Sequence, residues 1–399
     1  FSLPFISIAY DDHSTHQSLT EEIIKFFNAS YSDQAVLIDE GEHIISGSQE
    51  EDSDIRWMQH YYDPVYNRGL VLGDPESNPN LAMISAAGSV SPSAKAWAES
   101  SQLQKGGFSQ LFGGIFTNYF SDASDYSWER GIYEYAWGDQ KRGLESLGHV
   151  LHLIEDSSVP DHTRNDPHPA LGSYIPWRLT GAATWLFDSH SQTLNGSPYE
   201  GFAVFPRSSL NIANALRGER PKEFFTLAEY FNQLALYSNN NFFSRDTIFS
   251  SDYQFPVIDQ EKIIIENDHT KIFGYGKTTI GEEHPLVIKE ENTLTGEYAY
   301  FIEDKNNLIL SDYWRLLSRQ AVLHGAGVVK LFFDEVKKEK QTKALYNKNR
   351  SWLGTIFDSI FGSGNNQTAS IVKSVQDEAL PPPPPSVVLI EPPASLPLP

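Results

Sequence analysis

One short segment, His152 to His162, places three metal-capable side chains around the end of a predicted helix. His152 and Asp156 are four residues apart, so a helix carries both side chains on the same face. Pro160 does not continue a helix, and His162 is therefore expected to turn back toward that face from the next segment. Because the chain has no cysteine, metal binding depends on His, Asp and Glu. The segment predicts a zinc site with room for more than one ion.

Most of the chain around this segment has the apolar spacing of helices. Within residues 127–156 apolar positions recur at helical spacing, and the Gly-Asp pair at 138–139 interrupts them as a turn. This pattern predicts two packed helices, of which the second carries the ligands. Ser18–Glu21 has capping-box spacing ahead of another apolar run, which places His16 just before a helix. A further helix is expected from Ser311 to about Val336.

Between residues 250 and 310 the pattern changes to short β-favouring runs separated by Asn, Asp and Gly. These runs are Lys262–Ile265, Pro285–Ile288, Tyr298–Ile302 and Leu308–Leu310. A chain of 399 residues with 40% hydrophobic content can bury a large core as one large domain or two smaller ones. The sequence therefore predicts a mainly α fold with a small β-rich insertion.

Other segments supply further carboxylate and imidazole groups. Glu51–Pro64 contains a set of both ahead of an aromatic Tyr-Tyr-Asp-Pro turn, Thr15–His16 adds an imidazole, and Tyr199–Glu200 adds a carboxylate. Together with the His152 to His162 segment they resemble the bacterial zinc-dependent phospholipase C family and the related single-strand-specific zinc nucleases. The resemblance covers roughly residues 10 to 336 without the β insertion. It implies a multi-helix phospholipase C/nuclease-like domain.

The resemblance also implies a set of metal ligands for three zinc ions. One ion is surrounded by two histidines and two carboxylates, and one of those carboxylates bridges to a second ion. The implied ligands are Asp52, His60, His152 and Asp156 for the first ion, Asp156 and His16 for the second, and His162 and Glu200 for the third.

The chain departs from the family pattern at the third ion. The pattern places a histidine four residues before the final carboxylate, and this chain has Gly196 there. His168 is favoured as the replacement because it lies close in sequence to His162. His190 and Asp166 are the alternatives at this position.

The activity that the resemblance implies is zinc-dependent hydrolysis of a phosphoric diester. For a phospholipase C the products are diacylglycerol and a phosphorylated head group. Asp52 is the candidate for orienting or deprotonating the attacking water, with Asp54 as the alternative. Trp57 stands where phospholipase relatives place an aromatic residue that holds choline, and core packing is an equal alternative for it. Glu200, a glutamate where the nucleases have aspartate, is closer to the phospholipase branch.

Two other functions stay open on the sequence. A single-strand nuclease shares the same pattern, but a net charge of −22 repels polyanions, and nucleic-acid binders generally carry a basic face. The repulsion is weaker at the predicted site, since bound zinc ions reverse the local field. Gly196 motivates the second alternative, a protein that keeps zinc for stability, lacks turnover, and binds a lipid or a protein partner.

The N-terminal residues bear on localisation. Phe1–Ala9 is apolar and ends in a small-x-small pattern similar to a signal-peptidase site, without a basic region ahead of it. Cleavage there exposes Tyr10, which resembles the metal-binding terminus of the family; an ordinary buried strand or turn is the alternative. The family and this stretch together lead us to expect a secreted or periplasmic bacterial protein.

Residues 337–399 differ in character from the rest and are expected to lie outside the enzyme domain. Lys337–Lys343 is rich in lysine, and an apolar stripe follows within Trp352–Phe361. Such a basic and amphipathic stretch, 337–361, can dock on anionic lipid, but a short helix packed on the core or a partner is favoured. The remaining proline-rich tail is expected to be disordered or polyproline II. No apolar run is long enough to span a membrane.

Overall fold

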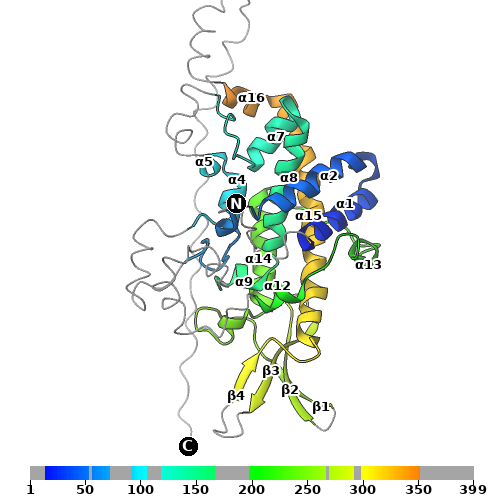
Figure 1. Ribbon diagram of the computed structural model, residues 1–399, viewed down its shortest axis with the longest axis vertical. Coiled ribbons are helices and arrows are strands. Elements are labelled where there is room, and N and C mark those ends of the chain that lie inside the picture. Colours follow the sequence, from blue (N-terminus) through cyan, green and yellow to red (C-terminus); the bar gives the residue numbers. More distant parts are fainter. Residues whose placement is uncertain are drawn as a thin grey trace, which may run out of the picture. The chain divides into compact units, whose positions relative to one another are not determined.

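The computed structural model describes residues 14–53, 56–71, 91–105, 118–166, 197–266, 269–291 and 298–350 (Figure 1). The fold is mainly α-helical with one small antiparallel sheet, which confirms the predicted mainly α class and its β-rich insertion. All of these residues belong to one compact unit that ends at Ser351. The predictions for residues 1–9 and for the proline-rich tail lie outside the described residues.

The helices and short 3₁₀ turns follow one another along the chain as listed here. The helices are α1 (Thr15–Ser30), α2 (Ile38–Glu50), α4 (Ala94–Glu99), α5 (Ser101–Gln104), α7 (Trp128–Trp137), α8 (Gln140–Asp156), α9 (Pro160–Thr163), α12 (Pro198–Phe202), α13 (Ile212–Ala215), α14 (Leu227–Asn241), α15 (Leu308–Thr342) and α16 (Ala344–Asn349). The 3₁₀ turns are η1 (Ser32–Gln34), η2 (Arg56–Gln59) and η3 (Arg245–Thr247).

Helix α8 is buried along most of its length between its neighbours. Its apolar side chains pack with those of α1, α2, α14 and α15 in one core. The contact with α2 is the closest, because two glycines let the backbones meet. A Cβ atom on Gly47 would lie 2.0 Å from the carbonyl oxygen of Glu145, and one on Gly148 would lie 2.0 Å from that of Ile44. The largest buried side chains of this core include Phe27, Tyr230, Phe231 and Phe332.

The two helices predicted within residues 127–156 are confirmed as α7 and α8. Each begins at a side-chain cap: Ser127 accepts a hydrogen bond from the Arg130 amide, and Asp139 accepts one from the Lys141 amide. The turn between them falls at 138–139, as the glycine there predicted. The predicted range and its turn are thus confirmed, whereas the two caps are seen only in the structure.

The predicted start of the first helix was wrong. Helix α1 begins at Thr15, so His16 lies in its first turn rather than ahead of it. Ser18 does not cap the helix; its hydroxyl donates to the Phe205 carbonyl, and the Thr15 hydroxyl donates to the Ala203 carbonyl. These hydroxyls instead attach the start of α1 to the segment that follows α12.

The end of α8 falls at the last residue of the predicted range, but Pro160 is not what ends the helix. The helix ends at Asp156, four residues before Pro160, and Pro160 is the first residue of α9. The hydroxyls of Ser157 and Ser158 donate back to carbonyls of the last turn of α8, which favours its termination there. The new helix α9 then carries His162 back toward α8, as expected.

The insertion forms a four-stranded antiparallel meander in the order β1-β2-β3-β4. Its strands are β1 (Gln260–Glu266), β2 (His269–Lys277), β3 (Glu283–Glu291) and β4 (Tyr298–Phe301). Buried residues of β3 pack on α15, so the sheet is attached near the start of that helix (Figure 1). The sequence did not predict β2, whose two glycines at 274 and 276 weaken the β pattern.

The predicted strand Leu308–Leu310 was wrong, because these residues form the first turn of α15. The Asp304 carboxylate accepts hydrogen bonds from the amides of Asn306 and Ile309 and so supplies a partner for a helix-start amide. Helix α15 also extends to Thr342, past the domain end expected at 336.

Residues after 336 continue the compact unit. The Glu339 carboxylate accepts hydrogen bonds from the amides of Leu345 and Tyr346 and from the indole of Trp137. The lysine-rich stretch therefore belongs to the last turns of α15, which contact α16 and α7. Residues 351–361 lie outside the described residues. Among the described helices, none combines the length and apolar character needed to cross a bilayer.

Candidate metal centre

Four helices and the loop after α2 bring seven predicted site residues into one region of the interior. Helix α8 supplies two of them, and the others come from α1, the loop segments that flank η2, α9 and α12. None has more than 4% of its surface exposed. The seven residues are His16, Asp52, His60, His152, Asp156, His162 and Glu200.

Four side-chain atoms lie at the spacing that a single tetrahedral ion requires. Nδ1 of His60 lies 3.5 Å from Oδ1 of Asp52 and 3.2 Å from Oδ2 of Asp156. Nε2 of His152 lies 3.6 Å from the same Asp52 oxygen and 3.2 Å from the same Asp156 oxygen. Ligand bonds of about 2.0–2.1 Å at tetrahedral angles separate ligand atoms by about 3.3–3.4 Å. The four atoms fit one ion.

The other oxygen of Asp156 faces a second group of side chains. Its Oδ1 lies 3.6 Å from Nε2 of His16 and 3.2 Å from Nδ1 of His162. His16, His152 and Asp156 also offer ligand atoms that all lie within 4.8 Å of one another. The two oxygens of one carboxylate are thus directed toward two neighbouring sets of imidazoles, which is the arrangement of a bridging ligand.

His162 connects Asp156 to Glu200 within this region. Nε2 of His162 lies 3.2 Å from Oε1 of Glu200, so one imidazole contacts Asp156 through one nitrogen and Glu200 through the other. Asp166, an alternative ligand, is buried, and its Oδ2 accepts a hydrogen bond from the Asp246 amide.

Several predicted site features lie outside the described residues. They are residues 1–13 with Tyr10, Asp54, His168, His190 and Gly196, together with the side chain of Trp57, whose backbone belongs to η2.

Hydrogen bonds on the far side of two imidazoles orient them toward the cluster. Nδ1 of His152 donates to the Ser48 carbonyl at 2.7 Å, which leaves Nε2 to face Asp52 and Asp156. Nδ1 of His16 is joined to Oε2 of Glu155 at 2.6 Å, and the Thr20 hydroxyl donates to Oε1 of that carboxylate at 2.7 Å. Partners of this kind fix the tautomer and ring orientation of metal-binding histidines.

A second buried network holds Glu51, the residue before Asp52. The Glu51 carboxylate accepts hydrogen bonds from Arg56 through two nitrogens and from the indole of Trp97 at 3.0 Å. It also lies 2.5 Å from Nδ1 of His149, which is on α8 one turn before His152. Burial raises the pKa of Glu51, but Arg56 and His149 outweigh it and lower the pKa to about 2. The network joins the loop that carries Asp52 to α8.

Burial and the neighbouring charges shift the pKa values of two imidazoles of the cluster in opposite directions. Burial lowers the pKa of His60 to about 4, whereas Asp52 and Asp156 outweigh burial and raise the pKa of His152 to about 10. Both ring nitrogens of His60 and both Asp156 oxygens are buried and make no hydrogen bond within the described part of the chain. Burying polar atoms without partners is costly, and a bound cation would satisfy them.

Sequence reasoning missed the residues that orient the imidazoles. Ser48 acts through its backbone carbonyl, which no side-chain pattern reveals. Glu155 lies between His152 and Asp156 in sequence, but its role depends on α1 packing beside α8. Glu51 was noticed only as a neighbour of Asp52. Contacts between helices, rather than spacing within one, identify all three.

Comparison with models of known protein families found no match, and comparison with curated protein sequences found none either. The described residues by themselves establish buried clusters of histidine and aspartate that could hold a metal ion. The residue types and their spacing fit such an ion.

Proposed function

We propose that this chain is a zinc-dependent phosphodiesterase that acts as a phospholipase C. The observation that carries the proposal is the position of Asp156, whose two oxygens face two neighbouring sets of imidazoles at 3.2–3.6 Å. Adjacent divalent cations in such a site stabilise both the attacking and the leaving oxygen of a phosphodiester. The resemblance described above leads to the same class of reaction.

Zinc is proposed as the metal because of the ligand types and their spacing. Imidazole nitrogens and carboxylate oxygens in a tetrahedral arrangement suit zinc, while magnesium and calcium prefer six or more oxygen ligands. His60, His152, Asp52 and Asp156 would hold one ion. His16, with the second oxygen of Asp156, would hold another. His162 and Glu200 would supply further ligand atoms next to these.

The zinc ions, when bound, would supply an acidified water and charge stabilisation for the phosphodiester oxygens. The residues of the chain then have distinct tasks. Asp52 is proposed to orient that water and accept its proton, and the Glu51 network holds the Asp52 loop against α8. Glu155 and the Ser48 carbonyl keep His16 and His152 in the tautomers that present Nε2 to the cluster.

A phospholipid is proposed as the substrate rather than a nucleic acid because of charge. The chain carries 52 acidic against 30 basic residues and a net charge of −22. Binding a long nucleic acid requires neutralising several phosphates with lysine and arginine, which this composition opposes. A single zwitterionic head group has no such requirement.

Hydrolysis of p-nitrophenyl phosphorylcholine by the zinc-loaded protein tests the proposal. We expect turnover that a chelator abolishes and zinc restores. Asp52→Asn should lower kcat by about 10²–10⁴, as expected for loss of a general base. Asp334→Asn, which removes an exposed carboxylate on α15 that forms an ion pair with Lys330, is the matched control and should leave turnover unchanged. Zinc content is measured for each variant, so that loss of metal and loss of base are separated.

Phosphatidylcholine and single-stranded DNA are assayed in parallel to distinguish the alternatives. Chelator-sensitive cleavage of DNA without cleavage of the lipid would favour the nuclease. Stoichiometric zinc with no turnover of any of the three substrates would contradict an enzyme and favour a zinc-stabilised binding protein.

A further inference from the structure

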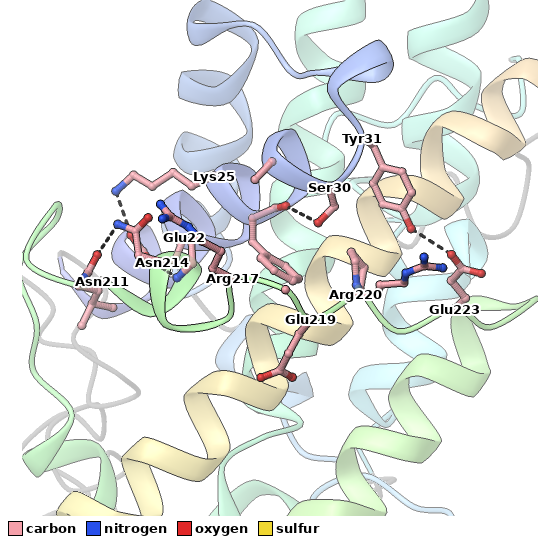
Figure 2. Close-up of a pocket in the computed structure, with 16 residues that line it drawn as sticks. Glu22, Lys25, Ser30, Tyr31, Asn211, Asn214, Arg217, Glu219, Arg220 and Glu223 are labelled. Carbon is pink, nitrogen blue, oxygen red and sulfur yellow. Dashed lines mark hydrogen bonds and ion pairs between the residues drawn. The ribbon is translucent and has the colours of Figure 1, made fainter.

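A cavity of about 740 Å³ lies beside α1, and none of the residues that line it belongs to the metal cluster. Its walls are the second half of α1 with Tyr31 and the segment 210–223, which includes α13 (Figure 2). His16 precedes Glu22, the first cavity residue on α1, by six positions, or about 9 Å along a helix. The cavity is therefore a site separate from the metal ligands.

The carboxylates of this cavity are already engaged within the protein. Each has a hydrogen-bond or ion-pair partner among the described residues. The pairs are Glu22 with Lys25 and the Ala213 amide, Glu219 with Arg319, and Glu223 with the Tyr31 hydroxyl. Lys25 and Arg319 therefore neutralise Glu22 and Glu219, whereas Glu223 keeps its negative charge at the Tyr31 end of the cavity.

Two arginines of the cavity have no such partner. Within the described part of the chain, the guanidinium groups of Arg217 and Arg220 make no hydrogen bond and no ion pair with a carboxylate. A turn at Gly218, whose φ of 94° favours glycine, brings both residues to the cavity. Both side chains are exposed to solvent at the cavity, so an external anion can reach them.

The rest of the lining suits the organic part of a small molecule. Phe26 and Leu210 provide apolar surface, and the amides of Asn211 and Asn214 provide neutral hydrogen-bonding groups. Figure 2 shows Arg217 on the side of Asn211 and Asn214 and Arg220 on the side of Tyr31. The cavity volume is within the range of ordinary small-molecule sites.

We propose that this cavity binds a small molecule that carries a phosphoryl group. Arginine matches phosphate geometry through paired N–H groups, and its charge persists at any physiological pH. The phosphoryl group can come from free phosphate or from an organic phosphomonoester; the apolar surface and the amides favour the organic source. This site goes beyond the proposed phosphodiesterase reaction and does not depend on it.

Isothermal titration of the full-length chain with inorganic phosphate and with phosphorylcholine tests the site. The test variant is Arg217→Gln combined with Arg220→Gln. The control combines Lys305→Gln with Lys337→Gln, which removes the same charge from exposed lysines elsewhere. We expect saturable binding by the parent chain and the control, tighter for phosphorylcholine, and a Kd at least about tenfold higher in the test variant.

The metal centre also attracts phosphate, so each titration is repeated after chelation. Binding that survives chelation and is lost in the arginine variant supports the proposed site. Binding that is equal in the arginine variant and the parent, or that disappears on chelation alone, overturns it. Zinc content and hydrolysis of p-nitrophenyl phosphorylcholine are measured on the same proteins, so failure of this site is distinguishable from failure of the proposed activity.

Discussion

Substitution of Gly148 by alanine should damage the metal centre without touching a ligand. The added Cβ would lie 2.0 Å from the Ile44 carbonyl oxygen and 2.7 Å from the Ser48 nitrogen, both on α2. Real Cβ atoms essentially never approach other atoms within 3.0 Å, so the two backbones must separate by at least about 1 Å. The Ser48 carbonyl, which orients His152, lies on the helix that must move.

The size of the effect follows from this separation. The hydrogen bond from His152 to the Ser48 carbonyl is 2.7 Å long, and a shift of about 1 Å along it would exceed hydrogen-bond range. Overpacking costs about 1–3 kcal/mol, and a buried polar group left without its partner costs about 1–3 kcal/mol more. We therefore expect the free energy of unfolding to fall by roughly 2–6 kcal/mol. Loss of an orienting partner should weaken metal binding by about 10–100-fold.

Urea denaturation and competition with a chromophoric zinc chelator measure these two quantities. Gly41→Ala is the matched control on α2, since its Cβ would meet only the Ile24 side chain at an ordinary 3.7 Å. Alanine is a better helix former than glycine by up to about 1 kcal/mol, so this control should be as stable as the parent or slightly more stable. If Gly148→Ala retained both parental stability and parental metal affinity, the close α2–α8 contact would not be what orients His152.

Three further predictions follow from the described contacts. Glu155→Ala should reduce metal affinity by about 10–100-fold, because His16 loses the carboxylate that orients it; unchanged affinity in the chelator competition would contradict that role. Burial lowers the pKa of His324 to about 4, below its ordinary 6.5, so the stability it contributes is complete above pH 6.5 and is lost as pH falls toward 4. A difference of that size is worth about 3 kcal/mol, and urea denaturation at several pH values should show a shallower acid loss for His324→Gln than for the parent; equal slopes would refute the assignment. Removal of metal should lower Tm, because an ion at a thousand times its Kd stabilises the folded state by about 4 kcal/mol; an identical Tm with chelator and with added zinc would argue against binding at this cluster.

The sequence alone determined features that depend on a few neighbouring residues. The spacing of His152 and Asp156 placed both on one face of α8, and the Gly-Asp pair at 138–139 located the turn between two helices. The shift to β-favouring runs located the insertion, although Leu308–Leu310 was assigned wrongly because three apolar residues fit a strand or a buried helix equally well.

Only the tertiary structure decided which distant side chains meet. Glu155 became the partner of His16 because α1 packs beside α8, and Ser48 reaches His152 because glycines let α2 approach α8 closely. The cavity at Arg217 and Arg220 likewise depends on how the segment 210–223 lies along α1. Periodicity reports which face of an element is apolar, whereas the partner of each face is set by packing among elements far apart in the chain.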